Sequence, residues 1–124
     1  MAIACAALLL TAAAAPAKVV RGTPQDDRLR GGNSADKIIG RSGADTLLGR
    51  KGADLLLGGS GRDRIAPGGA FDEVRAGGGR DVIRARDGGP DLIDCGKGRD
   101  RVVVDEVEDG VINCERVVEA AAGP

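Results

Sequence analysis

The chain has 124 residues, enough for a single domain, and its formal net charge is −1 at pH 7. Phe71 is the only aromatic residue and 21 residues are glycine, which argues against a globular core built from large side chains. The balanced charge argues against a nucleic-acid partner, and the absence of histidine removes the usual proton carrier of enzymes at neutral pH.

The first predicted element is a secretory signal peptide over residues 1–17. Residues 3–15 form an apolar run that is too short to span a bilayer, and Ala15-Pro16-Ala17 places small residues where an exporting peptidase cuts. The segment predicts a secreted protein without a membrane span. Two alternatives are a disordered alanine-rich tail and a lipoprotein attached through Cys5, although the apolar run mostly follows this cysteine instead of preceding it.

Residues 18–103 form a repeat with a period of nine. Each unit combines a glycine-rich turn, an aspartate and, two residues later, one aliphatic residue, and a single step is ten residues long. A short fixed period is typical of a solenoid. The repeated aspartates are Asp27, Asp36, Asp45, Asp54, Asp63, Asp72, Asp81, Asp91 and Asp100.

Each unit predicts a six-residue turn and a three-residue strand whose central side chain points inward. Strands this short need neighbours on both sides. Two units per coil predict an all-β fold. This fold is a parallel β-roll, which is a right-handed solenoid with two sheets and 18 residues per coil. One sheet would carry Leu29, Leu47, Ile65, Ile83 and Val102, and the other Ile38, Leu56, Val74 and Ile93.

Residues 104–124 break the pattern and predict a C-terminal cap and tail, with a final strand pair over 111–118. Once residues 1–17 are removed, Cys95 and Cys114 remain, and an even count in an exported chain predicts a disulfide that pins the cap to the last coil. Two free thiols are the alternative. The acidic cluster of this segment predicts a solvated turn or an additional cation site, and it comprises Asp105, Glu106, Glu108 and Asp109.

Stacked coils would place equivalent aspartates about 4.8 Å apart. At this distance two carboxylates repel each other by roughly 3–4 kcal/mol at an effective dielectric constant of about 20. A hard divalent cation would neutralise both ladders, because calcium binds carboxylate and backbone carbonyl oxygens. The alternative is neutralisation by the arginines that flank the aspartates, which are Arg28, Arg62, Arg64, Arg80, Arg99 and Arg101.

The pattern Gly-Gly-x-Gly-x-Asp-x-aliphatic-x, complete at residues 58–66, resembles the haemolysin-type calcium-binding (RTX) nonapeptide repeat. The resemblance implies a parallel β-roll that binds Ca²⁺ between successive coils through aspartates and turn carbonyls. By register, the implied metal ligands are Asp36, Asp45, Asp54, Asp63, Asp72 and Asp81. Three further aspartates match by register, but their turns depart from the glycine pattern, and these are Asp27, Asp91 and Asp100.

Together these observations predict a secreted, monomeric calcium-binding protein that folds on binding the ion and has no catalytic activity and no nucleic-acid partner. The alternatives are a calcium-rigidified adhesion or matrix scaffold and a remnant of a larger RTX toxin or hydrolase. Four apolar residues at outward strand positions predict either a partner surface or a contact with the N-terminal segment or the cap, and they are Ile39, Leu48, Leu55 and Leu57.

Overall fold

The computed structural model describes residues 17–85, 90–104 and 110–119. The predicted signal peptide, apart from Ala17, and the acidic cluster at 105–109 lie outside the described residues. A search of the described residues for a helix with the length and hydropathy of a membrane span found none.

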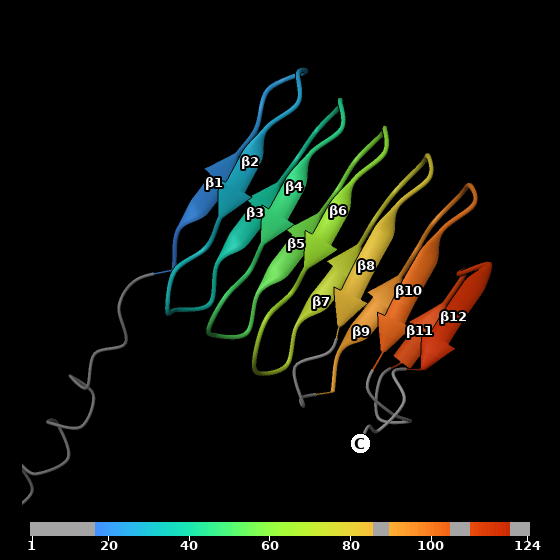
Figure 1. The fold of residues 1–124 in the computed structure, drawn as a ribbon. Helices are drawn as coiled ribbons and strands as arrows, with labels where there is room; N and C mark the ends of the chain where they lie inside the picture. The colour runs from blue at the N-terminus through green and yellow to red at the C-terminus, as the bar shows by residue number, and fades with distance from the viewer. Residues whose placement is uncertain (1–16, 86–89, 105–109, 120–124) are drawn as a thin grey trace, which may run out of the picture.

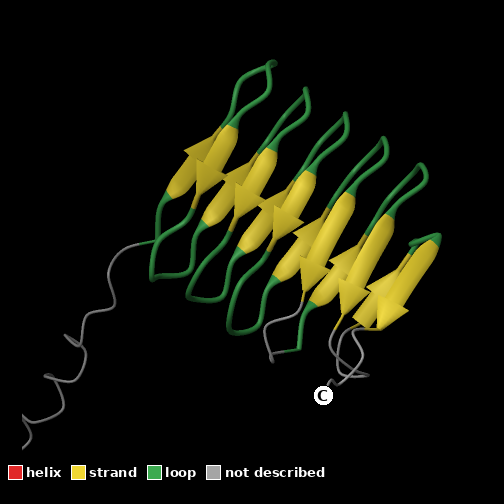
Figure 2. Cartoon of the chain, in the orientation of Figure 1, coloured by secondary structure: helices red, strands yellow, loops and turns green. Residues whose placement is uncertain are grey.

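The described residues form twelve short strands joined by turns, with no helix among them (Figures 1 and 2). Most strands have three residues, as the nine-residue period predicts. The strands are β1 (Val19–Arg21), β2 (Arg28–Arg30), β3 (Lys37–Ile39), β4 (Thr46–Leu48), β5 (Leu55–Leu57), β6 (Arg64–Ala66), β7 (Glu73–Arg75), β8 (Val82–Ala85), β9 (Leu92–Asp94), β10 (Arg101–Val104), β11 (Gly110–Ile112) and β12 (Arg116–Glu119).

The strands form two parallel six-stranded sheets, which confirms the predicted two-sheet roll. The odd sheet has the order β1-β3-β5-β7-β9-β11, and the even sheet has the order β12-β10-β8-β6-β4-β2. Central residues one coil apart pair directly, as Leu47 does with Ile65. Successive turns lie along opposite long edges of the roll (Figure 1).

The two rows of central strand residues extend beyond the predicted rows at both ends. Val20 pairs with Ile38, so the stack begins one strand before the first strand that was predicted. At the other end β11 pairs with β9, and β12 pairs with β10. The predicted C-terminal strand pair therefore exists, and it continues both sheets of the roll.

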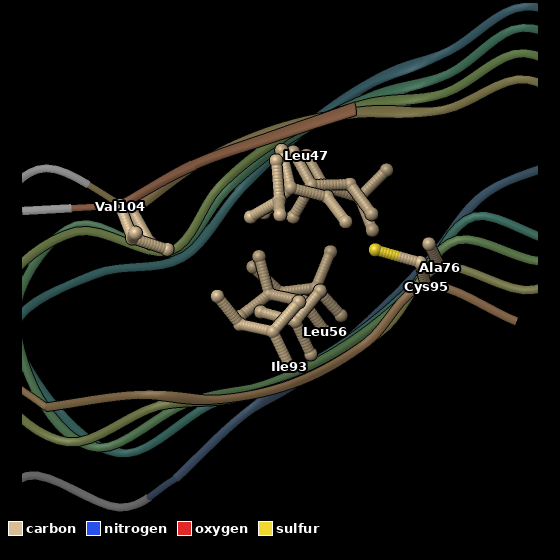
Figure 3. Close-up of a cluster of buried hydrophobic side chains, with 12 residues drawn as sticks. Leu47, Leu56, Ala76, Ile93, Cys95 and Val104 are labelled. Atoms are coloured by element: carbon tan, nitrogen blue, oxygen red, sulfur yellow. The ribbon is translucent and has the colours of Figure 1, made fainter. Parts of the chain in front are cut away.

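The core consists of the two predicted rows of aliphatic side chains, one from each sheet. Leu47 faces Leu56 and Ile93 across a thin interior (Figure 3). From Ile38 to Val102 the central residues of the strands are at most 2% exposed. Burying one such side chain contributes about 1.5–3 kcal/mol. Phe71 lies outside this core and is exposed.

The Cys95–Cys114 disulfide confirms the predicted pairing, and the two Cα atoms are 5.0 Å apart. Cys95 follows β9 and Cys114 follows β11, so the bond ties the last coil to the coil before it. Cys95 is buried and packs with the core cluster, and its sulfur lies at the edge of the interior near Ala76 (Figure 3).

The apolar residues predicted to form one outward surface are divided between the two sheets. Ile39, Leu55 and Leu57 belong to the odd sheet, whereas Leu48 belongs to the even sheet. These residues are close in the sequence, which suggested a single surface. Each nine-residue step, however, moves a residue to the opposite sheet. All four are half-buried.

Candidate metal centre

The repeated aspartates form two ladders, one along each edge of the roll. The turns that lead into the even sheet carry Asp27, Asp45, Asp63, Asp81 and Asp100, and the turns that lead into the odd sheet carry Asp36, Asp54, Asp72 and Asp91. Asp27 is half-buried, and the other eight are at most 4% exposed. The predicted ligands thus stack in the expected register, and they are sealed inside the turns.

From Asp36 to Asp100, one carboxylate oxygen of each aspartate accepts a hydrogen bond from a backbone N–H one coil earlier, whereas Asp27 accepts hydrogen bonds from Thr23 of its own turn. The backbone N–H of Asp45 donates to Oδ1 of Asp63 at 2.9 Å, and the N–H of Asp63 donates to Oδ1 of Asp81 at 2.8 Å. On the other edge the N–H of Asp36 donates to Oδ1 of Asp54 at 2.7 Å. The hydrogen bond to Oδ1 therefore fixes the register between neighbouring coils. This role of Oδ1 was not predicted from the sequence.

In three central aspartates the second carboxylate oxygen has no such partner. Oδ2 of Asp45, Asp54 and Asp63 is buried and accepts no hydrogen bond from the residues that the structure describes. A buried polar atom without a partner is costly and calls for an explanation, such as an ion.

Backbone carbonyl oxygens converge with these carboxylate oxygens beside the glycine that stands five residues before each of Asp45, Asp54 and Asp63. Asp63 Oδ2 and the Ala76 carbonyl oxygen lie 2.7 and 2.6 Å from the point where a Cβ on Gly58 would sit. One coil earlier, Asp45 Oδ2 and the Gly58 carbonyl oxygen lie 2.7 and 2.6 Å from the corresponding point on Gly40. Glycine thus leaves open a small space lined by oxygens, which are the ligands that calcium prefers.

The electrostatics of the ladders favour a cation. The pKa of Asp54 and that of Asp63 are each raised to about 6, chiefly by burial and also by the charge of the aspartate one coil earlier, against the effect of a backbone hydrogen bond. Burial and the charges of Asp63 and Asp100 raise the pKa of Asp81 to about 8. A bound cation would restore the ionised form of these carboxyls.

Asp36 is the exception, because a cation from the chain itself lies beside it. Burial raises the pKa of Asp36, but hydrogen bonds from the backbone N–H groups of Gly32 and Lys18 and the charge of Lys18 outweigh burial, so the net shift is downward. The two hydrogen bonds measure 2.6 and 3.1 Å. Lys18 stands nine residues before Asp27, so it occupies an aspartate position of the repeat.

The arginines that flank the aspartates do not neutralise the ladders. All six are exposed. Within the described parts of the chain, the one salt bridge found joins Arg75 to Glu73, and neither residue belongs to a ladder. The arrangement therefore gives no support to metal-free neutralisation by arginine.

A search of the described residues for three or more clustered His, Cys, Asp or Glu side chains found none. The reason is geometric, since each turn contributes one carboxylate and the remaining oxygens come from the backbone. Sequence reasoning named the aspartates but did not identify the individual carbonyls of residues 58 and 76. Their signal was the glycine five residues before the aspartate, which is present in the turns up to Asp63 and is replaced by Pro67 before Asp72 and by Ala76 before Asp81.

The sequence profile of a known family, described as RTX calcium-binding nonapeptide repeat (4 copies), matches the chain in five overlapping windows. These windows are residues 21–56, 30–65, 39–74, 57–92 and 67–102. Searches of curated proteins and of solved structures returned no match.

Proposed function

Because this chain belongs to the family of RTX calcium-binding nonapeptide repeats, whose profile covers residues 21–102, we propose that it is a secreted calcium-binding protein whose roll folds on binding the ion. The observation that carries the proposal is the buried, unpartnered Oδ2 of Asp45, Asp54 and Asp63, each beside a glycine that leaves room for an ion.

The proposed ligands are shared between neighbouring coils. On one edge Asp45 would act with Asp63, and Asp63 with Asp81; the pairs on the other edge would be Asp36 with Asp54 and Asp54 with Asp72. Asp27, Asp91 and Asp100 would complete the ladders at their ends. Turn carbonyls such as those of Gly58 and Ala76 would supply further oxygens.

Calcium would supply the positive charge that the ladders lack, and the chain itself accounts for the coupling to folding. Separated coils leave the aspartates in water, where each carboxylate is ionised and solvated. Stacking the coils buries the aspartates beside like charges, which opposes folding unless a cation compensates. Metal binding and folding should therefore be one process.

Secretion rests on residues 1–17, whose apolar run and small-residue cleavage site predict a signal peptide, and on the Cys95–Cys114 disulfide, which suits an oxidising compartment. Outside the cell calcium is abundant, so the chain would remain unfolded before export and fold afterwards. In this proposal the protein has no catalytic activity of its own.

Circular dichroism during a calcium titration tests the proposal. The β signal should appear with calcium and disappear when EGTA is added. Asp63→Asn should raise the calcium midpoint, because it removes a charged ligand from the centre of one ladder. The matched control is Glu73→Gln, which removes one negative charge from the outer face of the odd sheet and should leave the midpoint unchanged. A β signal that persists in EGTA would refute calcium-dependent folding.

A further inference from the structure

The outer face of the even sheet carries arginines that the calcium sites do not use. They stand at the outward positions of the strands, and all are exposed. The residues paired with them across the sheet are threonine, valine, leucine or another arginine, and none is acidic. This arginine face comprises Arg28, Arg30, Arg64, Arg84, Arg101 and Arg116.

The arginine face is not compensated by neighbouring acids. Across the described residues, the salt-bridge search found a pair only on the odd sheet, where Arg75 lies 2.8 Å from Glu73. Outward positions of the odd sheet carry three cations and two acids, together with hydrophobic residues; the charged residues are Arg21, Lys37, Arg75, Glu73 and Asp94. The near-neutral net charge of the chain therefore conceals a strong asymmetry between the two faces.

The centre of the arginine face is hollowed. A depression of about 430 Å³ is lined by Thr46, Leu48, Arg64, Val82, Arg84 and Arg101. Its floor is apolar, and its charged groups are guanidinium groups, which bind carboxylate and sulfate oxyanions in a bidentate manner. Arg64 and Arg101 stand in the same register on alternate strands, so their Cα atoms repeat at about 10 Å along the roll.

We propose that the arginine face binds a linear anionic polysaccharide through the carboxylate or sulfate groups that recur along its chain. A regular row of guanidinium groups on a straight sheet matches a straight polymer with regular charges. The apolar floor formed by Leu48 and Val82 suits the C–H faces of sugar rings. This inference goes beyond calcium binding and requires only that the roll be folded.

Two other polyanions fit the face less well. Single-stranded nucleic acid is bound through aromatic side chains on which bases stack, and the single aromatic residue, Phe71, precedes a strand of the odd sheet. An anionic membrane surface is bound by long apolar side chains that insert among the lipids. Here the apolar residues between the arginines, Leu48, Ala66 and Val82, are half-buried.

The test measures binding of the calcium-loaded full chain to heparin, which is sulfated, and to polygalacturonate, which is carboxylated. Dextran serves as the neutral control. The triple variant Arg64→Gln, Arg84→Gln, Arg101→Gln should bind one or both polyanions about 10- to 100-fold more weakly than the unaltered chain. Raising the salt concentration should weaken binding of the unaltered chain.

A matched triple variant on the odd sheet removes the same charge from the other face. Arg21→Gln, Lys37→Gln, Arg75→Gln should retain affinity within about twofold, because these residues lie outside the arginine face. Circular dichroism in calcium establishes that both variants are folded, which separates this test from that of calcium-dependent folding. Equal losses in the two variants, or no binding to either polysaccharide at physiological salt, would overturn the proposal. Tighter binding to single-stranded DNA or to phosphatidylserine vesicles would do the same.

Discussion

Two adjacent glycines in one turn provide a sharp test of how closely the coils stack. Gly79 has a φ of +106°, and a Cβ added to it would collide with the carbonyl oxygen of Gly61 in the coil before it. Gly78 does not have a left-handed φ, and an added Cβ would meet no atom within 4 Å. The two residues therefore differ in local geometry but share the same turn.

Gly79→Ala should destabilise the calcium-loaded roll by about 2–4 kcal/mol. The left-handed backbone alone costs an alanine about 1–2 kcal/mol, and displacement of the neighbouring coil accounts for the rest. Gly78→Ala should change stability by less than about 1 kcal/mol, and in the stabilising direction, because alanine restricts the unfolded chain.

Urea unfolding at saturating calcium, followed by circular dichroism, measures both changes. The slope of free energy against urea should be the same for the two variants and the unaltered chain, so that midpoints report stability. Gly79→Ala should also raise the calcium concentration needed for folding. Equal destabilisation by the two substitutions would show that the coils do not stack as closely as the structure indicates.

Three further predictions concern pH, the disulfide and the N-terminus. The pKa of the buried aspartates is raised, to about 6 for Asp63. Above pH 4 the calcium-free folded state therefore binds more protons than the unfolded state does. The stability of the calcium-free folded state should consequently fall as pH rises from 4 to 8. Calcium should add more stability at pH 8 than at pH 5, and the strength of the β signal in circular dichroism with calcium or EGTA at each pH checks the sign. Replacing Cys95 and Cys114 by alanine should cost about 3 kcal/mol in urea unfolding, because the bond closes a loop of about 20 residues; an unchanged midpoint would show that the last coil needs no tether. The backbone N–H of Lys18 donates to Asp36, and cleavage after Ala17 would turn this N–H into a charged α-amino group. A chain that begins at Lys18 should therefore melt at a higher temperature than the same chain with an acetylated N-terminus.

The sequence predicted the periodic part of the roll because every nine residues repeat the same physical requirement. One aliphatic side chain must enter the core, as Leu47 and Ile65 do, and their direct pairing follows from two units per coil. The first strand was harder to predict, because Val20 keeps the aliphatic position while Lys18 stands where the aspartate would be and no glycine-rich turn precedes it. A valine without its turn carries too little information to assign a strand.

The cation site was only partly predictable for a different reason. Aspartates can be read from the sequence, but a backbone carbonyl exists at every residue, so nothing distinguishes those of Gly58 and Ala76 until the coils are stacked. The burial of Asp63 and the use of its Oδ1 as a hydrogen-bond acceptor also depend on the neighbouring coil. Sequence reasoning therefore gave the ligand type and its spacing, and the structure added which oxygen remains available.

The arginine face and the aspartate ladders should be linked through charge. The chain carries a net charge of −1, and residues 1–17 contain no charged side chain, so one bound calcium would give the exported protein a net charge of about +1. Calcium would thus neutralise the interior while the arginines remain exposed outside.

By thermodynamic reciprocity, a polysaccharide that binds the calcium-loaded roll more tightly than the calcium-free chain must in turn raise the affinity of the chain for calcium. Heparin should therefore lower the calcium midpoint of folding when free calcium is fixed by a chelator buffer. It should not do so for the triple variant Arg64→Gln, Arg84→Gln, Arg101→Gln, and an equal shift in that variant would show that the effect does not pass through the arginine face.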